Sequence, residues 1–533
     1  MTDPPRSDSQ GGHVRETRIR GPHCDGRQTG VPSVLSVFME PGLCYPDADD
    51  AFCPGEHYPE YPFNQIASRP NRVYAAVRRI WAQAGLDTPR YGTTSWNPLG
   101  VYIQPGDNVF ILCNFVHHRK AHESVEAFSA KCTHGSVLRA VADYALIAAG
   151  PTGRVEFGNA PIQATNWERV LRETGAAAMA DFYHRSGAAI VPRDLRMFVS
   201  GRSVLGGVTS VEERSTDEEV VEIDLGSDSL LASLPYNGPA RFRVADYDPR
   251  RTEKYHAAGR HVYAVNRRVL AADVVISVPK LKTHEKVGIT CGLKGLVGAI
   301  ALKDCLAHHR RGAPDRGGDE FPRECWTLQV ISSLHEWVFR RAPNAPAQNL
   351  LHVLDRNLRR VVSRSGGTFG GAWHGNDTAW RMALDIARIL AYANAQGEMT
   401  ETRQRKHVVL IDGIIGGDGE GPLSPSPVAS GILLFSDDLA IGDRAAATFM
   451  GYCPERLPIV REAFTCQRYP LAASTPDQAN IIVNSEPTDW KWLSALRTHP
   501  FRAPRGWRGW IEAEPSIDHG ERSERRHGSH AEQ

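Results

Sequence analysis

The sequence has little that would place it in a membrane or on nucleic acid. No apolar run reaches eighteen residues, and the N-terminal stretch lacks the apolar segment of a signal peptide. Lysine plus arginine (62) nearly equals aspartate plus glutamate (61), which leaves a formal charge of +1. This balance, together with the lack of a recognised motif, argues against nucleic-acid binding. We expect a cytoplasmic protein without a membrane partner.

Cysteine motifs are also lacking. The ten cysteines are spread from Cys24 to Cys466, and none forms a CxxC pair. Ferredoxin-type clusters and zinc ribbons therefore lose their usual signature, and most thiols are expected to be buried as small apolar groups. Hydrophobic residues at 41% and charged residues at 23% are instead typical of a folded globular chain.

The length of 533 residues predicts more than one structural unit. Polar segments at 1–30 and 516–533 are predicted to be disordered tails, because they cannot bury enough apolar surface to offset the cost of ordering. Between them we expect an N-terminal lobe at 31–265, with an irregular insertion around 200–260, and a C-terminal lobe at 266–515. The two lobes would flank a cleft.

The interior alternates apolar β-like runs with amphipathic helical stretches. A strand at 109–113 is followed by a helix that Thr133 or Ser136 would cap and Gly150 would end, and then by a strand at 154–157. Further strands are expected at 273–278, 408–411, 432–435 and 481–483. Asp377 or Thr378 would cap another helix, on whose exposed face Arg381, Asp385 and Arg388 would pair. This order predicts an α/β fold with a mainly parallel sheet and flanking helices.

Basic and small residues concentrate after the strand at 273–278. In an open α/β sheet, ligands bind at the carboxyl ends of the strands, where this segment places Lys280, Lys282, Thr283 and His284. Lys294 follows within a run of glycines, which permit close approach of a ligand to the backbone. A lysine supplies a positive charge or a nucleophile, and a histidine supplies an acid or base. The sequence therefore predicts a functional site here.

His308 and His309 come next and are candidate metal ligands. Adjacent side chains on a helix point about 100° apart. We expect at most one of the two to face the site.

A second candidate segment is DGIIGGDGEGPL at 412–423. Its glycines are typical of a loop that folds around a phosphate or presents carboxylates to a cation, although it has neither a P-loop nor an EF-hand pattern. A flexible surface loop is the alternative. The ligand-binding candidates in this segment are Asp412, Gly417, Asp418, Gly419 and Glu420.

Two weaker segments complete the set. Asn376, Asp377 and Arg381 lie at a predicted helix start, where amides and an arginine would suit an anion, although ordinary capping also explains the first two. Asn114 follows the strand at 109–113. Together the four segments would line one cleft at the strand ends.

These motifs closely resemble the family called domain of unknown function 362 (DUF362). The resemblance rests on DVVISVPKLKTHE at 273–285, GLKGLVG at 292–298, GNDTAWR at 375–381 and DGIIGGDGEGPL, and it extends over roughly 100–470. Some relatives carry ferredoxin-like cysteine repeats, which this chain lacks. The family commonly has a lysine–proline pair before the asparagine, whereas this sequence has Leu112 and Cys113 before Asn114.

The order of His284, the glycine-flanked Lys294 and a later histidine is also similar to the nickel-pincer-nucleotide lactate racemase family. That similarity implies that His284 is the acid or base, that Lys294 is the cofactor tether or anion anchor, and that His308 or His309 is the metal ligand. A shared architecture is expected more than a shared cofactor. The cofactor itself is not determined: a metal and a nucleotide-derived group both remain candidates.

Three functions stay open from the sequence. The first is an enzyme, with isomerase chemistry favoured, that acts on a small anionic metabolite, a carboxylate or phosphate, through His284 and Lys294. The second is a metal- or iron–sulfur-linked redox protein that uses Cys291, Cys305, His308 and His309. The third is a non-catalytic module that binds a metabolite. The oligomeric state is not determined.

Overall fold

The computed structural model describes residues 32–202, 208–214, 217–235, 241–244, 247–340, 353–354, 357–358, 361–362, 367–496 and 500–514. The predicted tails at 1–30 and 516–533 lie outside the described residues. Within the described part, no helix is both long and apolar enough to cross a bilayer.

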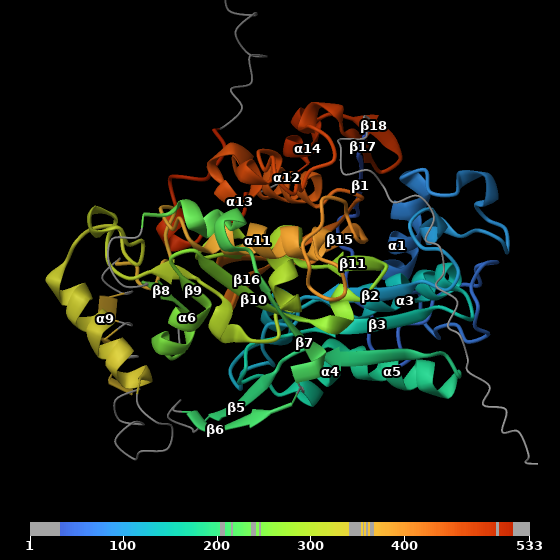
Figure 1. Ribbon diagram of the computed structural model, residues 1–533. Helices are drawn as coiled ribbons and strands as arrows, with labels where there is room; N and C mark the ends of the chain where they lie inside the picture. The colour runs from blue at the N-terminus through green and yellow to red at the C-terminus, as the bar shows by residue number, and fades with distance from the viewer. Residues whose placement is uncertain are drawn as a thin grey trace, which may run out of the picture.

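A large mixed sheet forms the centre of the molecule (Figure 1). Its strand order is β18-β17-β1-β16-β15-β11-β2-β3-β4, with β12 and β13 joined beside β15. The pairs β11–β2, β2–β3, β3–β4 and β11–β15 are parallel, whereas β15–β16 and β1–β16 are antiparallel. The prediction of an α/β fold with a mainly parallel sheet is confirmed. The strands are β1 (Val34–Met39), β2 (Asn108–Cys113), β3 (Arg154–Asn159), β4 (Ile190–Asp194), β11 (Val274–Val278), β12 (Lys280–His284), β13 (Gly288–Ile289), β15 (Lys406–Glu420), β16 (Ser424–Ser436), β17 (Asn480–Val483) and β18 (Glu486–Thr488).

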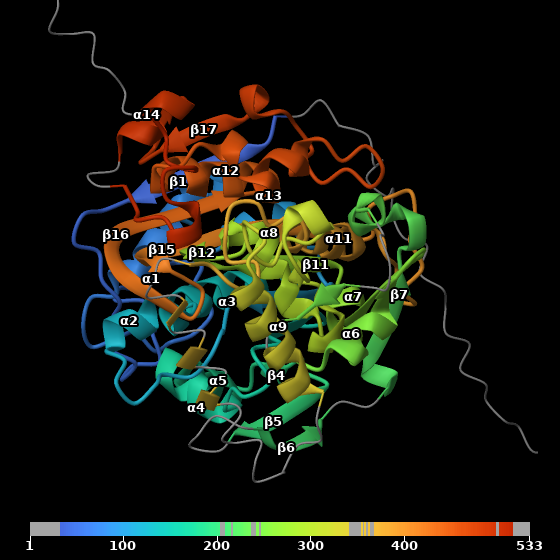
Figure 2. The ribbon, with the colours of Figure 1, turned by 90° about the vertical axis from the view of Figure 1, so that its left-hand side faces the viewer.

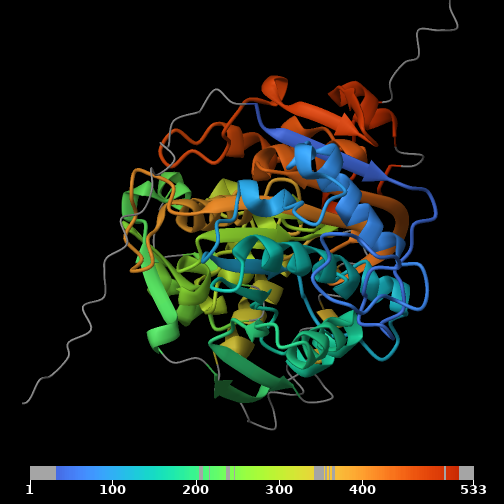
Figure 3. The ribbon, with the colours of Figure 1, turned by 90° about the vertical axis from the view of Figure 1, so that its right-hand side faces the viewer.

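Helices cover both faces of this sheet (Figures 1 and 3). Alternate strand residues point to opposite faces, so β2 sends Phe110 into one core and Ile111 into the other. The core that contains Phe110 is completed by α8, α11 and α12, and the core that contains Ile111 is completed by α1 and α3. The helices are α1 (Arg72–Gln83), α2 (Val125–Ser129), α3 (Gly135–Ala149), α4 (Trp167–Thr174), α5 (Ala176–Arg185), α6 (Pro249–Tyr255), α7 (Arg267–Leu270), α8 (Cys291–Gly295), α9 (Trp326–Phe339), α11 (Ala379–Tyr392), α12 (Leu439–Met450), α13 (Pro458–Arg461) and α14 (Trp490–Ala495).

The predicted two-lobe division is not confirmed. The central sheet pairs β2, from the expected N-terminal lobe, directly with β11, from the expected C-terminal lobe. The region expected to be an irregular insertion forms small separate sheets, and α9 stands at the edge of the molecule, in front in Figure 2. These small strands are β5 (Phe198–Arg202), β6 (Val208–Glu213), β7 (Val220–Asp224), β8 (Phe242–Arg243), β9 (His256–Ala257), β10 (Arg260–Asn266) and β14 (His309–Arg310).

The predicted cap of α3 is wrong, whereas at α11 the predicted Thr378 is the N-cap residue but its side chain makes no capping hydrogen bond. The N-cap of α3 is His134, whose Nδ1 accepts from the Ser136 amide, while the Thr133 hydroxyl donates to the Val278 carbonyl at 2.7 Å. At α11 the capping oxygen belongs to Asn376, which accepts from the amides of Thr378 and Ala379. In each case the expected residue is engaged by a neighbouring element that local sequence does not reveal.

The pairing predicted on α11 forms in part, but its expected exposure is wrong. Asp385 and Arg388 do form an ion pair, at 3.1 Å, but it is buried, and Arg381 pairs with Asp377 instead. The Asp385 carboxylate also accepts hydrogen bonds from Ser229, in the region expected to be an insertion, and from Tyr263, just after that region. That region therefore packs on α11 and turns its polar face into an interior.

Candidate functional site

A cavity of about 250 Å³ opens at the carboxyl ends of β2 and β3, beside β12. We call it the inner cavity. Its position is the one where parallel sheets usually bind ligands. The polar residues that line it include Asn114, Asn159, Lys282, His284, Lys294 and His308. The structure thus brings together four of the candidates from the sequence's basic segment with Asn114.

Four buried lysines line the inner cavity. Lys282, Lys286, Lys294 and Lys303 all line it, and each is at most 7% exposed. Lys282 donates to the Asn114 side chain and to the Lys131 carbonyl, and Lys303 donates to two backbone carbonyls. Within the described part of the chain, no hydrogen bond or ion pair engages the Lys294 ammonium. Unlike most buried charges, this one has no partner among the residues that the structure describes.

Burial lowers the pKa values of three of these lysines. It lowers the pKa of Lys294 to about 8, with a further contribution from Lys286, and lowers the pKa of Lys282 and of Lys303 to about 7. An anion placed among them would raise these pKa values again, because it stabilises the charged form. The inner cavity therefore favours the binding of a negatively charged ligand.

The two histidines of the inner cavity both keep Nε2 free, but in opposite hydrogen-bonding states. Nδ1 of His284 accepts from the Lys286 amide at 3.1 Å, so the neutral ring carries its proton on Nε2. Nδ1 of His308 donates to the Leu306 carbonyl at 2.8 Å, which leaves a lone pair on its Nε2. Burial and then the nearby Lys294 lower the pKa of both rings well below 6.5. Both are thus neutral near physiological pH, His284 as a donor and His308 as an acceptor.

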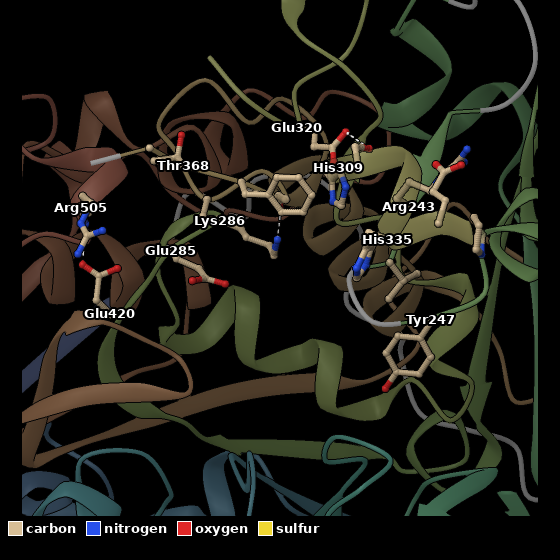
Figure 4. A pocket seen from close by; sticks show the side chains of 18 residues that line it. Arg243, Tyr247, Glu285, Lys286, His309, Glu320, His335, Thr368, Glu420 and Arg505 are labelled. Carbon is tan, nitrogen blue, oxygen red and sulfur yellow. Dashed lines mark hydrogen bonds and ion pairs between the residues drawn. The ribbon is translucent and has the colours of Figure 1, made fainter. Parts of the chain in front are cut away.

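His309 lies in a second cavity, of about 240 Å³, which we call the outer cavity (Figure 4). The backbone at His309 is extended, and its side chain turns away from that of His308 into this neighbouring space. Val244, Tyr247, Glu285 and Lys286 line both cavities, so the two adjoin. Of the two histidines, His308 lines the inner cavity and His309 lines the outer cavity.

Lys280 and Asp412 do not line either cavity. They form a fully buried ion pair at 3.0 Å, and the Asp412 carboxylate also accepts from the Tyr45 hydroxyl at 2.5 Å and from the His134 amide. The Lys280 ammonium donates to the same hydroxyl. This cluster joins β12, β15, α3 and the N-terminal segment, and its hydrogen bonds account for both charges.

The loop predicted over 412–423 is wrong for most of its length. Residues 412–420 continue β15, which forms a long hairpin with β16, seen at the left of Figure 2, and only 421–423 form the turn between them. A Cβ at Gly417 would stand 3.1 Å from the Lys282 Cβ, and one at Gly421 would stand 2.1 Å from the Thr283 carbonyl oxygen. The glycines therefore let β12 pack against β15 instead of cradling a phosphate.

The remaining candidates of this hairpin have protein partners. The Thr283 hydroxyl donates to the Gly419 carbonyl at 2.8 Å, and Asp418 pairs with Arg502 at 2.7 Å. Glu420 accepts from the Arg505 amide at the rim of the outer cavity. None of these side chains lines the inner cavity.

The helix start at α11 lies outside the inner cavity as well. The Asn376 amide group donates to the His308 and Gly371 carbonyls, which supports the segment that carries both histidines. Asp377 and Arg381 pair with each other beside a separate surface pocket. The glycine-rich turn before Lys294 is also occupied internally, because the amides of Gly292 and Leu293 donate to the Asp443 carboxylate.

A metal centre receives no support from side-chain placement. Among the residues that the structure describes, no group of three or more His, Cys, Asp or Glu side chains is placed to hold a metal ion. Burial raises the pKa of the Cys291 and Cys305 thiols, the latter to about 12, which keeps both protonated. Thiolates, not thiols, are metal ligands.

Sequence reasoning missed Lys286 and Lys303. Lys286 stands two residues beyond His284 and supplies both the amide that fixes this histidine and an ammonium between the two cavities. Its position in the same basic segment was an available signal. Lys303 had none, since it reaches the cavity through a turn after α8 and is held there by the Ala160 carbonyl.

Comparison with known families adds one finding. Residues 209–448 match the model of DUF362, a domain of unknown function. The match supports the DUF362 resemblance of the motifs. It contains β12, Lys294, His308, His309 and the whole β15–β16 hairpin, while Asn114 lies before it. A search of curated proteins gives no match. The DUF362 match therefore identifies related sequence and assigns no activity.

Proposed function

We propose that the inner cavity binds a small anionic metabolite, a carboxylate or phosphate, and that the protein is an enzyme which, where the anion is a carboxylate, moves a proton at the carbon beside it. The observation that carries the proposal is the set of four buried lysines around one cavity, with the Lys294 ammonium unpaired in the described part of the chain. A ligand anion would supply the missing partner, and charge-assisted hydrogen bonds of this kind are strong.

The two neutral rings supply the proton chemistry. His308 presents the Nε2 lone pair and acts as the base, whereas His284 donates from Nε2 to the ligand. This assignment differs from the sequence expectation, in which His284 was the acid or base. The lysines stabilise the negative charge that develops when a proton leaves a carbon next to a carboxylate.

The similarity to nickel-pincer lactate racemases enters the proposal as a similarity of reaction type, isomerisation at a carbon. Lys294 and His308 are the residues that would hold such a group, as tether and as ligand, because the first has an unpaired amine and the second a free lone pair. When bound, the group would supply a metal-held reactive centre. The inner cavity alone, at about 250 Å³, is smaller than the roughly 300 Å³ at the lower end of ordinary ligand pockets.

The binding half is tested by calorimetry with inorganic phosphate and L-lactate on the whole chain. We expect Lys294→Met to weaken binding by about 10- to 100-fold, since a hydrogen bond to a charged group contributes about 1.5–3 kcal/mol. Lys491→Met, at an exposed lysine on α14, is the matched control and should bind like the wild type. The proposal would be refuted if neither phosphate nor L-lactate bound, or if Lys294→Met bound them with unchanged affinity.

The catalytic half is tested by exchange of the C2 hydrogen of lactate in deuterated water. His308→Asn keeps a donor for the Leu306 carbonyl but lacks the Nε2 lone pair, so we expect it to stop exchange while leaving binding intact. His284→Gln keeps a donor and should retain part of the rate. Binding without exchange in the wild type would make the protein the non-catalytic module, the alternative that stayed open from the sequence.

A further inference from the structure

The outer cavity contains polar groups that have no hydrogen-bond partner among the described residues. His309 is 5% exposed, and neither of its ring nitrogens makes a hydrogen bond within the described part of the chain; Nδ1 is fully enclosed. The Thr368 hydroxyl in the same lining is enclosed and without a partner too. Buried polar groups are almost always hydrogen-bonded, so two such groups in one cavity point to a ligand.

Figure 4 shows how the side chains lie around this space. His309, His335 and the Lys286 amine point into the cavity, Tyr247 lies at the side that adjoins the inner cavity, and the Lys286 amine is held by the Gly370 carbonyl. Lys286 thus stands at the boundary of the two cavities. A ligand that reaches from one to the other would pass its ammonium.

The two cavities differ in charge. The inner lining contains four lysines and a single carboxylate, Glu285, whereas the outer lining contains four glutamates, two arginines and Lys286. A second anionic group would meet repulsion in the outer cavity. A ligand ammonium group would find two of the cavity's carboxylates already engaged. Glu336 pairs with Arg243 at 2.5 Å, and Glu320 accepts a hydrogen bond from Ser332 at 3.0 Å. An uncharged body suits this lining.

The hydrogen-bonding capacity of the unpartnered groups indicates which chemical groups this uncharged part of the ligand carries. Burial lowers the pKa of His309 well below 6.5, so its neutral ring offers one donor and one acceptor, and the Thr368 hydroxyl can do either. Ligand hydroxyl groups both donate and accept, and so can satisfy both. The adjoining cavities together reach the ordinary volume of a ligand site, which neither reaches alone.

We propose that the two cavities form one bipartite site for a phosphorylated polyol or sugar, with the phosphate in the inner cavity and the hydroxyl-bearing body in the outer cavity against His309 and Thr368. This inference rests on the proposed function, because it takes anion binding by the inner cavity as given, and it goes further by naming the substrate class. It assigns the outer cavity the role of selecting substrates by their neutral part.

The test is calorimetry on the whole chain with inorganic phosphate, glycerol 3-phosphate, ribose 5-phosphate and unphosphorylated ribose. We expect at least one sugar or polyol phosphate to bind 10-fold or more tightly than phosphate, and ribose to bind weakly. His309→Phe and Thr368→Val should remove most of this advantage without changing phosphate affinity. Lys294→Met should weaken phosphate and phosphate ester alike. Thermal unfolding of each variant verifies its fold. If one of the two outer-cavity variants does not fold, the other is enough for the test.

The outcomes separate this inference from the proposed function. If phosphate binds and depends on Lys294 but the esters bind no more tightly, or if their advantage survives both outer-cavity variants, the bipartite site is wrong and anion binding by the inner cavity stands. If no phosphate or ester binds and Lys294→Met changes nothing, both fail.

Discussion

Lys280 and Lys282 are two residues apart on the same strand and are both fully buried, yet they meet opposite surroundings. The pairing of β12 with β15 shifts register between them, so that Lys280 lies opposite Asp412 and Lys282 lies opposite Gly417. Lys280 gains a carboxylate, and Lys282 gains a residue without a side chain beside the inner cavity.

The difference teaches how to distinguish structural from functional buried charge. Around Lys280 every charge is matched inside the protein, so the cluster stabilises the join between strands. Within the described part of the chain, Lys282 and Lys303 are held by neutral groups and Lys294 by no hydrogen bond or ion pair, so an anion that binds among these three lysines offsets the cost of burying them. Variants in the two regions should therefore change stability in opposite directions.

The largest effect is expected for Asp412→Asn. Removing the carboxylate leaves Lys280 buried and unpaired, which costs about 3–5 kcal/mol of unfolding free energy. Urea denaturation measures it. The double variant Lys280→Met/Asp412→Leu removes both charges and should be closer to the wild type. A single variant with wild-type stability would show that the comparison is wrong.

Lys294→Met should act in the opposite sense. It removes an unpaired buried charge, so we expect equal or higher stability without ligand, while anion affinity falls as described above. The same urea titrations check it, with Lys282→Met as a second member of the cluster. A loss of several kcal/mol would place Lys294 among the structural charges.

The pH dependence sharpens the same contrast. The folded pKa of Lys294, about 8, lies below its ordinary value near 10.5, so between these values the unfolded chain binds more protons. Stability of the ligand-free protein should therefore rise with pH above about 8, and phosphate affinity should fall. Both trends should be weaker in Lys294→Met. Parallel behaviour of the two proteins would assign the pH dependence to other groups.

The smallest effect is expected at the tip of the hairpin. Arg502 is 61% exposed where it pairs with Asp418, and exposed ion pairs contribute about 0–1 kcal/mol. Arg502→Met should leave both stability and anion affinity nearly unchanged. Loss of anion binding in this variant would restore the sequence hypothesis that Asp418 belongs to the ligand site.

Much of the sheet was predictable from local pattern. The strands β2, β3, β11 and β17 and the helix α3 follow apolar periodicity, which reports burial directly. The hairpin at 412–421 was not predictable, because its glycines are typical of a loop and their reason is the approach of β12. The cap predicted for α3 failed similarly, since Thr133 is engaged by β11 and not by its own helix.

By itself, the sequence determined the α/β class and the place where the chemistry concentrates, because periodicity and strand-end position are local properties. The tertiary structure alone decided which lysine lies beside a carboxylate, whether Nε2 of each cavity histidine carries a proton or a lone pair, and that His308 and His309 face different cavities. These depend on strand register and on hydrogen bonds from neighbouring segments, which no local pattern specifies.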